Sequence, residues 1–220
     1  IITDLDKAIQ NDDLLLIRKL LAQLGKTPFY KKEKPSPFNE AVSLIWYLEH
    51  VFYHSIPKIY NYIQHHIYDG KPIDNEIIDL GFWPGGDRDG NPFVTTKITL
   101  DVAERLRQTI LKSYYRDIRR LKRRFTFDGV QDILSRVEKR LYKHVIRSYV
   151  EINFSQKILL EELYAAREII VNEHQSLFIE ELNDVINKVR IFGFHFATLD
   201  IRQDSRVHHH AFVKLVEDLH

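Results

Sequence analysis

A cluster of glycine and proline at residues 81–92 divides a chain whose apolar residues otherwise recur with the period of helices. Four of the eight glycines and two of the seven prolines lie in this window. Both residue types interrupt regular structure, so the backbone must turn here between two long helical regions. The apolar residues before the turn predict a short buried strand. A long helix is expected after it, beginning at Thr95 or Thr99 and running to about Arg124.

Helical periodicity predicts mainly α structure on both sides of this window. Ser36 followed by Pro37 is typical of a helix start, and Pro57 is expected to kink or restart that helix. The other expected helices cover residues 14–24, 130–144, 155–172 and 176–190, and a last one begins near Ser205.

The residues from Ile191 to Arg202 alternate with a period of two and are apolar on both sides until the carboxyl end. This pattern is typical of a strand that is buried on both faces. Parallel strands need long crossover connections, and long helices precede each expected strand. We therefore expect long helices plus two short, adjacent, parallel strands near 78–83 and 191–201.

Composition excludes several classes of protein. Lys and Arg total 32 against 31 Asp and Glu, which excludes binding of nucleic acid through bulk positive charge. The absence of Cys excludes disulfides, zinc–thiolate sites and a Cys nucleophile, and it fits a cytoplasmic location. No apolar run reaches the roughly 18 residues that span a bilayer, so no membrane partner is expected. Met is also absent and the chain begins at Ile1, from which we expect either an excerpt of a longer protein or a chain from which some residues are missing.

Residues 85–92 form the unbroken octet Gly-Gly-Asp-Arg-Asp-Gly-Asn-Pro. Clustered glycine lets backbone N–H groups point at an anion. Arg88 offers a planar fork that suits phosphate or carboxylate. Asp87 and Asp89 either hold that guanidinium or contribute to a divalent-cation site. The alternative is a strand-to-helix turn with a capping Asp and a surface ion pair.

Asp200 and Arg202 project from the same side of the second expected strand. Charged groups at the end of an apolar strand are costly unless they are paired or serve a ligand. We therefore expect Arg202 to face an anion cavity shared with the octet, with Asp200 fixing its guanidinium. The alternative is a structural pair that closes the end of the strand.

Two further features have simpler interpretations. The basic run Arg116–Arg124 can grip nucleic acid, but the balanced net charge favours a solvated helix face. His208–His210 and His65–His66 are consecutive, whereas metal ligands on a helix need a spacing of four. No metal site is expected in this chain.

These residues together resemble the phosphoenolpyruvate carboxylase family, over essentially the whole chain. Two blocks match in the family's order, which makes a chance resemblance improbable. The segments that carry the resemblance are Gln23, Thr27, Lys34–Ala41, Trp83–Thr95 with its octet, Phe192-Gly193 and Leu199–Ser205.

The resemblance implies an enzyme, a carboxy-lyase that joins phosphoenolpyruvate to bicarbonate and forms oxaloacetate and phosphate with Mg²⁺ or Mn²⁺. It implies a cytoplasmic homotetramer that supplies the tricarboxylic acid cycle. The implied fold is a helix-embellished (β/α)₈ barrel, of which residues 1–220 would be one incomplete fragment. Arg202 would be catalytic, binding phosphate or stabilising anionic intermediates, and Arg88 would either bind substrate or orient the loop. The implied substrate-binding residues are Trp83, Gly85, Gly86, Asp87, Arg88, Asp89 and Asn91.

Several family features have no counterpart here. The missing features are the catalytic-His motif, the Lys-bearing loop, the acidic metal ligands, the mobile Gly/Arg-rich loop and the aspartate inhibitor site. Near Thr27, residues Gly25, Pro28 and Phe29 replace the Trp and acids that are usual in the family, and Phe82-Trp83-Pro84 and Asp204 are milder variants. We therefore expect the isolated chain to be inactive and to lack the metal ligands.

Two other functions stay open. One is a helical interaction module without catalysis, with nucleic acid bound through Arg116–Arg124. The other is an all-helical phosphate-metabolising enzyme that uses its glycine loop differently. That enzyme would need its own general base and metal ligands, and the sequence offers no convincing set.

Overall fold

The computed structural model describes residues 1–28, 34–71, 73, 77–146 and 154–218. The chain forms two compact units, one of residues 1–35 and one of residues 36–220. The first unit is a hairpin of α1 (Ile2–Gln10) and α2 (Leu14–Lys26). Asp13 starts α2 by accepting a hydrogen bond from the Leu16 N–H (3.0 Å), which satisfies one orphan donor of the first turn.

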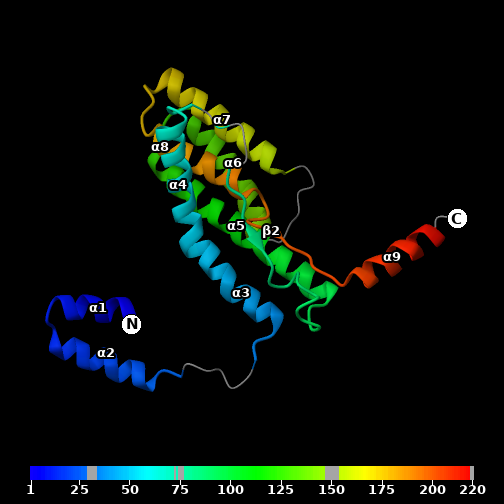
Figure 1. Ribbon diagram of the computed structural model, residues 1–220. Coiled ribbons are helices and arrows are strands. Elements are labelled where there is room, and N and C mark those ends of the chain that lie inside the picture. The colour runs from blue at the N-terminus through cyan, green and yellow to red at the C-terminus, as the bar shows by residue number, and fades with distance from the viewer. Residues whose placement is uncertain (29–33, 72, 74–76, 147–153, 219–220) are drawn as a thin grey trace. The chain divides into compact units, whose positions relative to one another are not determined.

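The second unit holds the remaining elements (Figure 1). In chain order they are α3 (Pro37–Tyr47), η1 (Leu48–Phe52), α4 (Tyr53–Ile67), β1 (Gly81–Phe82), α5 (Thr96–Arg124), α6 (Val130–Ile146), α7 (Gln156–Glu173), α8 (Ile179–Phe192), β2 (Thr198–Leu199) and α9 (Ser205–Glu217). The expectation of a mainly helical protein is confirmed. The capping residues explain the boundaries, because Ser36 caps α3, Thr95 caps α5 and Ser155 caps α7 through their side-chain oxygens.

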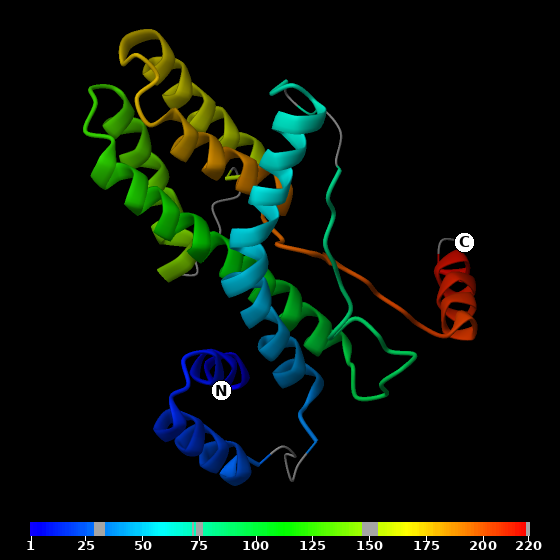
Figure 2. The same ribbon diagram turned by 60° about the vertical axis from the view of Figure 1, so that its left-hand side comes forward.

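Helices α5 to α8 form the core of this unit. Each packs against the next, and α8 returns to pack against α5 (Figures 1 and 2). Their inward faces are fully buried at positions such as Leu106, Ile110, Leu134, Leu163 and Val189. Among the described residues, no helix combines the length and apolar character that a membrane-spanning segment requires.

The helix that follows Ser36 does not restart at Pro57. Pro57 lies inside α4, and the π-helical segment η1 precedes α4. Proline cannot donate to the carbonyl four residues earlier, here that of Tyr53, and its ring crowds that carbonyl. A wider π turn beside this point lets the chain stay helical while the backbone adjusts.

The two strands are adjacent and parallel, as expected. Gly81 pairs with Thr198 and Phe82 with Leu199. Each strand has only two residues, and the expectation of a strand over 191–197 is wrong, because α8 continues to Phe192 and a tight turn follows.

The composition of that turn explains the error. Gly193 and Phe196 both adopt positive φ, 54° and 69°. The Phe192 and Phe196 rings pack against Tyr53, with centroids 5.6 and 6.2 Å from it. Residues of this turn are therefore buried in several directions, which produces the apolar pattern of a strand buried on both faces without extended backbone.

Candidate functional site

The glycine-rich octet begins three residues after the end of β1, beyond Trp83 and Pro84. The N–H groups of Gly86 and Asp87 both donate to the Trp83 carbonyl, at 2.9 and 3.2 Å, which turns the chain. Gly85 adopts φ +84°, and a Cβ there would lie 2.6 Å from the Val102 side chain on α5. A larger residue would be strained and would collide with the helix, so this position requires glycine.

Backbone hydrogen bonds join the octet to the residues after β2. The Arg202 N–H donates to the Gly86 carbonyl (3.1 Å), and the Arg88 N–H donates to the Arg202 carbonyl (3.0 Å). A Cβ on Gly86 would overlap the Asp200 carbonyl oxygen. The structure thus brings Asp87 and Arg202 side by side as a parallel bridge.

The Arg202 guanidinium lies at the surface with the Asp200 carboxylate, on the segment that follows β2. Nε and Nη2 both lie 2.9 Å from Asp200 Oδ2, and the two side chains are 62% and 48% exposed. An exposed pair of this kind contributes about 0–1 kcal/mol to stability. The pair orients Arg202 without burying it, so an anion can still reach the guanidinium.

Arg88 points inward instead. Its Nη2 donates to Thr99 Oγ1 (3.3 Å), and that hydroxyl donates to the Gly85 carbonyl (2.8 Å). Within the described part of the chain, the buried Nε of Arg88 has no hydrogen-bond partner. The arrangement favours a loop-orienting role for Arg88. Sequence reasoning missed Thr99 in this role and treated it only as a possible start of the helix.

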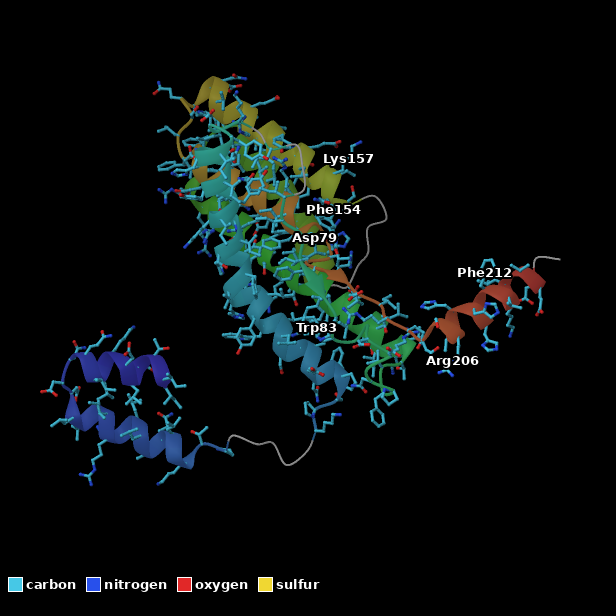
Figure 3. The ribbon with its side chains drawn as sticks, in the orientation of Figure 1. Asp79, Trp83, Phe154, Lys157, Arg206 and Phe212 are labelled. Atoms are coloured by element: carbon cyan, nitrogen blue, oxygen red, sulfur yellow. The ribbon has the colours of Figure 1, made fainter. Side chains whose placement is uncertain are left out.

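The acidic and amide side chains of the octet close its own turns. Asp87 Oδ1 accepts from the Gly90 N–H (2.9 Å), and Asn91 Oδ1 accepts from the Phe93 N–H (3.1 Å). Trp83 is 58% exposed at the start of the loop (Figure 3). Asp87 therefore closes a turn of the loop through Oδ1.

A model of the phosphoenolpyruvate carboxylase family matches residues 3–153 and 135–220, which together cover the octet and Arg202. The chain belongs to the phosphoenolpyruvate carboxylase family. It is similar to the phosphoenolpyruvate carboxylases of Aeromonas hydrophila and Shewanella sediminis, each 28% identical, over 92% and 93% of this chain. The enzyme of Nitrosomonas eutropha is 26% identical over 91% of the chain.

The chain spans only about a quarter of these carboxylases, 27% of the first two and 26% of the third. The described residues of this chain do not form the metal site that the family resemblance implies. Among the described residues, no group of three His, Asp or Glu side chains is placed to hold a metal ion. That the metal ligands lie outside this chain stays a prediction.

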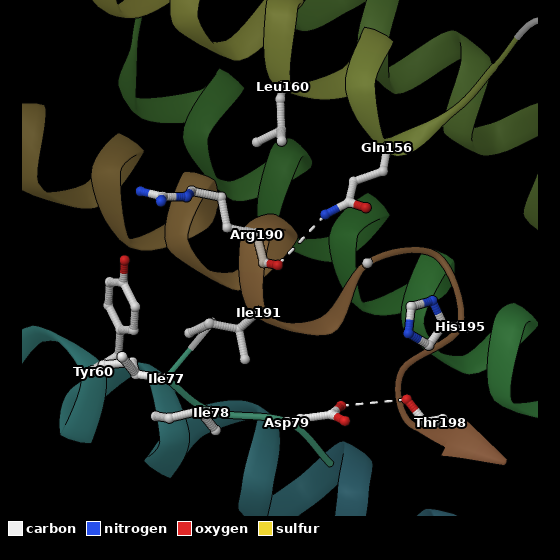
Figure 4. A pocket seen from close by; sticks show the side chains of 11 residues that line it. Tyr60, Ile77, Ile78, Asp79, Gln156, Leu160, Arg190, Ile191, His195 and Thr198 are labelled. Atoms are coloured by element: carbon white, nitrogen blue, oxygen red, sulfur yellow. Dashed lines mark hydrogen bonds between the residues drawn. The ribbon is translucent and has the colours of Figure 1, made fainter. Parts of the chain in front are cut away.

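A cavity of about 420 Å³ lies at the opposite ends of the strands (Figure 4). Its walls come from residues 77–79, before β1, and from the end of α8, the turn after it and the start of β2. The lining residues of these last segments are Arg190, Ile191, Gly193, His195 and Thr198, and Tyr60, Gln156 and Leu160 complete the walls. Asp79 accepts a hydrogen bond from Thr198 Oγ1 (3.3 Å) at its edge. The octet and Arg202 follow the strands, so they lie at the carboxyl ends, away from this cavity.

The basic run of α5 is largely neutralised by acids of the same chain. Arg116 pairs with Glu49 (2.6 Å), and both Arg119 and Lys122 pair with Glu138 (3.4 and 2.7 Å). The remaining pairs are Arg120 with Asp117 and Arg124 with Glu181. Phosphate contacts would have to compete with these carboxylates.

Hydrogen bonds and ion pairs between buried ionisable groups connect α4, α5 and α8. Asp117 accepts from the Tyr53 hydroxyl (2.8 Å) and from Lys188 Nζ (3.0 Å), and Lys188 also contacts Asp184 (2.7 Å). Burial, followed by the nearby charge of Asp117, raises the pKa of Tyr53 well above its usual value. The pKa of Tyr114 is raised for the same two reasons.

Proposed function

We propose that this chain is part of an enzyme that carboxylates phosphoenolpyruvate with bicarbonate, giving oxaloacetate and phosphate. The observation that carries the proposal is the pair of backbone hydrogen bonds that fixes the octet on the segment of Arg202, at 3.0 and 3.1 Å. Substrates, intermediates and product of this reaction are anions. A glycine turn and an exposed guanidinium held at the same edge suit them.

In this proposal Arg202 binds phosphate or stabilises the anions that form when the phosphoryl group passes from phosphoenolpyruvate to bicarbonate. Trp83 and the octet shape the pocket beside it. Arg88 holds the loop through Thr99, and its buried Nε retains hydrogen-bonding capacity within the described part of the structure. Mg²⁺ or Mn²⁺ would neutralise phosphoryl charge, and we assign its ligands to parts of the enzyme outside this chain.

The proposal extends to the architecture. We propose that both units belong to one larger cytoplasmic carboxylase chain, and that β1 and β2 are neighbouring strands of an incomplete (β/α)₈ barrel. Their parallel pairing and the placement of the octet and Arg202 at the carboxyl ends support this assignment. A homotetramer is the proposed assembly of the intact enzyme.

The test is an NMR titration of the chain with phosphoenolpyruvate and, separately, with inorganic phosphate. We expect shifts of the amide signals of Gly85, Gly86, Arg88 and Arg202, and we expect Arg202→Gln to abolish them. Arg206→Gln is the matched control, because Arg206 is also exposed and also pairs with an Asp two residues earlier (2.7 Å). Shifts that survive in R202Q, or no shifts at the octet, would contradict the proposal.

Activity gives a second test. The isolated chain should produce no oxaloacetate from phosphoenolpyruvate and bicarbonate in a coupled assay, because the metal ligands and catalytic His are expected elsewhere. In the intact carboxylase, R202Q should lower kcat by about 10²–10³-fold, the usual effect of losing one donor to a developing anion. Metal-dependent turnover by the isolated chain would refute the assignment of these groups to other parts of the enzyme.

A further inference from the structure

Tyr114 is a fully buried polar side chain that the proposed site does not use. It lies on α5 with 0% exposure, and its hydroxyl donates toward the Gly193 carbonyl (2.7 Å). The Lys188 carbonyl lies 3.3 Å from the same hydroxyl. Gly193 is the residue that ends α8. Carbonyls at the end of a helix lack partners within it, so Tyr114 supplies one from another helix.

The turn that Tyr114 holds has a backbone conformation that needs support. Gly193 has φ +54° and lies so close to His195 that a Cβ would come within 2.8 Å of its ring. Phe196, three residues later, has φ +69°, a conformation that non-glycine residues rarely adopt. Such conformations persist when the surrounding structure fixes them. The Tyr114 hydrogen bond and the burial of Phe196 provide that fixation.

The same turn leads directly into β2. Three backbone N–H groups of this segment donate to carbonyl oxygens on or near β1. The pairs are Thr198 to Leu80 (2.7 Å), Asp200 to Phe82 (2.9 Å) and Arg202 to Gly86 (3.1 Å). A pairing this short is weak by itself, because isolated short strand pairs are marginal in water. The position of Arg202 relative to the octet therefore depends on the conformation of the turn that precedes β2.

Nearby contacts hold α8 against α5 at this point. Asp117 is one helical turn after Tyr114, and its carboxylate accepts from Lys188 on α8 (3.0 Å). Both of these side chains are buried. The ion pair keeps the two helices in register, and the Tyr114 hydroxyl then meets the Gly193 carbonyl.

We propose that Tyr114 is a positioning residue: by holding the Gly193 carbonyl it sets the placement of β2 on β1 and so of Arg202 on the glycine-rich octet. The anion that Arg202 then binds rests on the proposed function. The placement of Arg202 on the octet does not rest on the proposed function, because it is a property of the chain without ligand.

The test is amide hydrogen exchange of the chain, followed residue by residue by NMR. Tyr114→Phe keeps the ring and removes only the hydroxyl. We expect the amides of Thr198, Asp200 and Arg202 to exchange roughly three- to tenfold faster, the effect of losing one hydrogen bond. Amides in the middle of α6 and α7 should change by less than twofold.

Ser113→Ala is the matched control, because Ser113 is also a buried hydroxyl on α5, yet its bonds go to Thr109 (3.0 Å) and Arg116 (3.0 Å) of the same helix and not to α8. Equal acceleration in both variants, or no selective change after residue 197, would overturn the proposal. The unmodified chain gives an independent check. The Tyr114 hydroxyl proton should exchange slowly enough with water for its NMR signal to be observed. A missing signal would contradict the hydrogen bond from Tyr114 to the Gly193 carbonyl. Because no ligand is present, these results are separable from failure of the phosphate titration.

Discussion

The amide of Arg202 donates to the carbonyl of Gly86 at 3.1 Å, and this bond helps to join two segments that are more than a hundred residues apart in the chain. Gly86 permits the contact because it has no side chain: a Cβ would overlap the Asp200 carbonyl oxygen. The anion-binding proposal therefore depends on a close approach between two backbones as well as on a charged side chain.

Replacing Gly86 with Ala should separate the octet from the segment after β2. We expect the free energy of unfolding to fall by about 1–3 kcal/mol, the usual cost of inserting a methyl group into a well-packed place. Gly81→Ala is the control, since a Cβ at Gly81 would meet nothing within 4 Å. Urea unfolding of both variants measures the difference, and equal stabilities would show that the loop adapts freely.

Replacing Lys188 with Met should destabilise the fold strongly. The change leaves Asp117, which is buried, and Asp184 without their shared cation. Removing one partner of a buried pair typically costs about 3–5 kcal/mol. The exposed Lys112 on α5 offers a comparison, and Lys112→Met should change stability by less than about 0.5 kcal/mol. A small loss for K188M would mean that water reaches the cluster.

Alkaline pH should unfold the chain partly through Tyr53. Its pKa in the folded chain is raised above the usual 10.0 by burial and then by Asp117. The neutral phenol is therefore favoured by folding, and this contribution is complete below pH 10 and lost as the pH rises through the folded-state pKa. Thermal unfolding midpoints between pH 8 and 11 should fall less steeply in Tyr53→Phe, and parallel curves would exclude this contribution.

Nucleic acid should bind weakly to the basic run on α5. Five of its six cations are paired with carboxylates of the same chain. Binding of labelled single- and double-stranded DNA, measured by fluorescence anisotropy at 50 and 200 mM salt, should therefore be weak. Tight binding with a steep salt dependence would instead favour the interaction module, because phosphate contacts release counterions.

Local sequence signals were sufficient wherever one side chain decides the outcome. Ser36 and Thr95 cap their helices by accepting hydrogen bonds from the N–H three residues later, at 3.2 and 3.3 Å. The sequence indicates the start at Ser36 and narrows the other start to Thr95 or Thr99. The octet and the Asp200–Arg202 pair were also recognisable, since glycine clustering and charge at the end of an apolar run are visible in sequence. The resemblance to the carboxylase family further indicated that these two segments belong to one site, because they occur in the family's order.

Residues 191–197 show where such reading fails. Their alternation indicates burial on several sides, and both an extended strand and a tight aromatic turn satisfy that pattern. The choice depends on Tyr114 and Tyr53, which come from distant helices. Likewise, the inward direction of Arg88 depends on Thr99, and the use of Asp87 depends on the Gly90 N–H.

By itself the sequence determined most of the helices other than α1, the break at the glycine loop and the chemistry available there, because these follow from neighbouring residues. Only the tertiary structure decided which group each buried hydroxyl bonds, where β2 begins and how the backbone of Arg202 is bonded to the octet. Those outcomes depend on contacts between residues far apart in the chain, whose geometry is set by the packing of α5 against α8 and is not encoded in any local pattern.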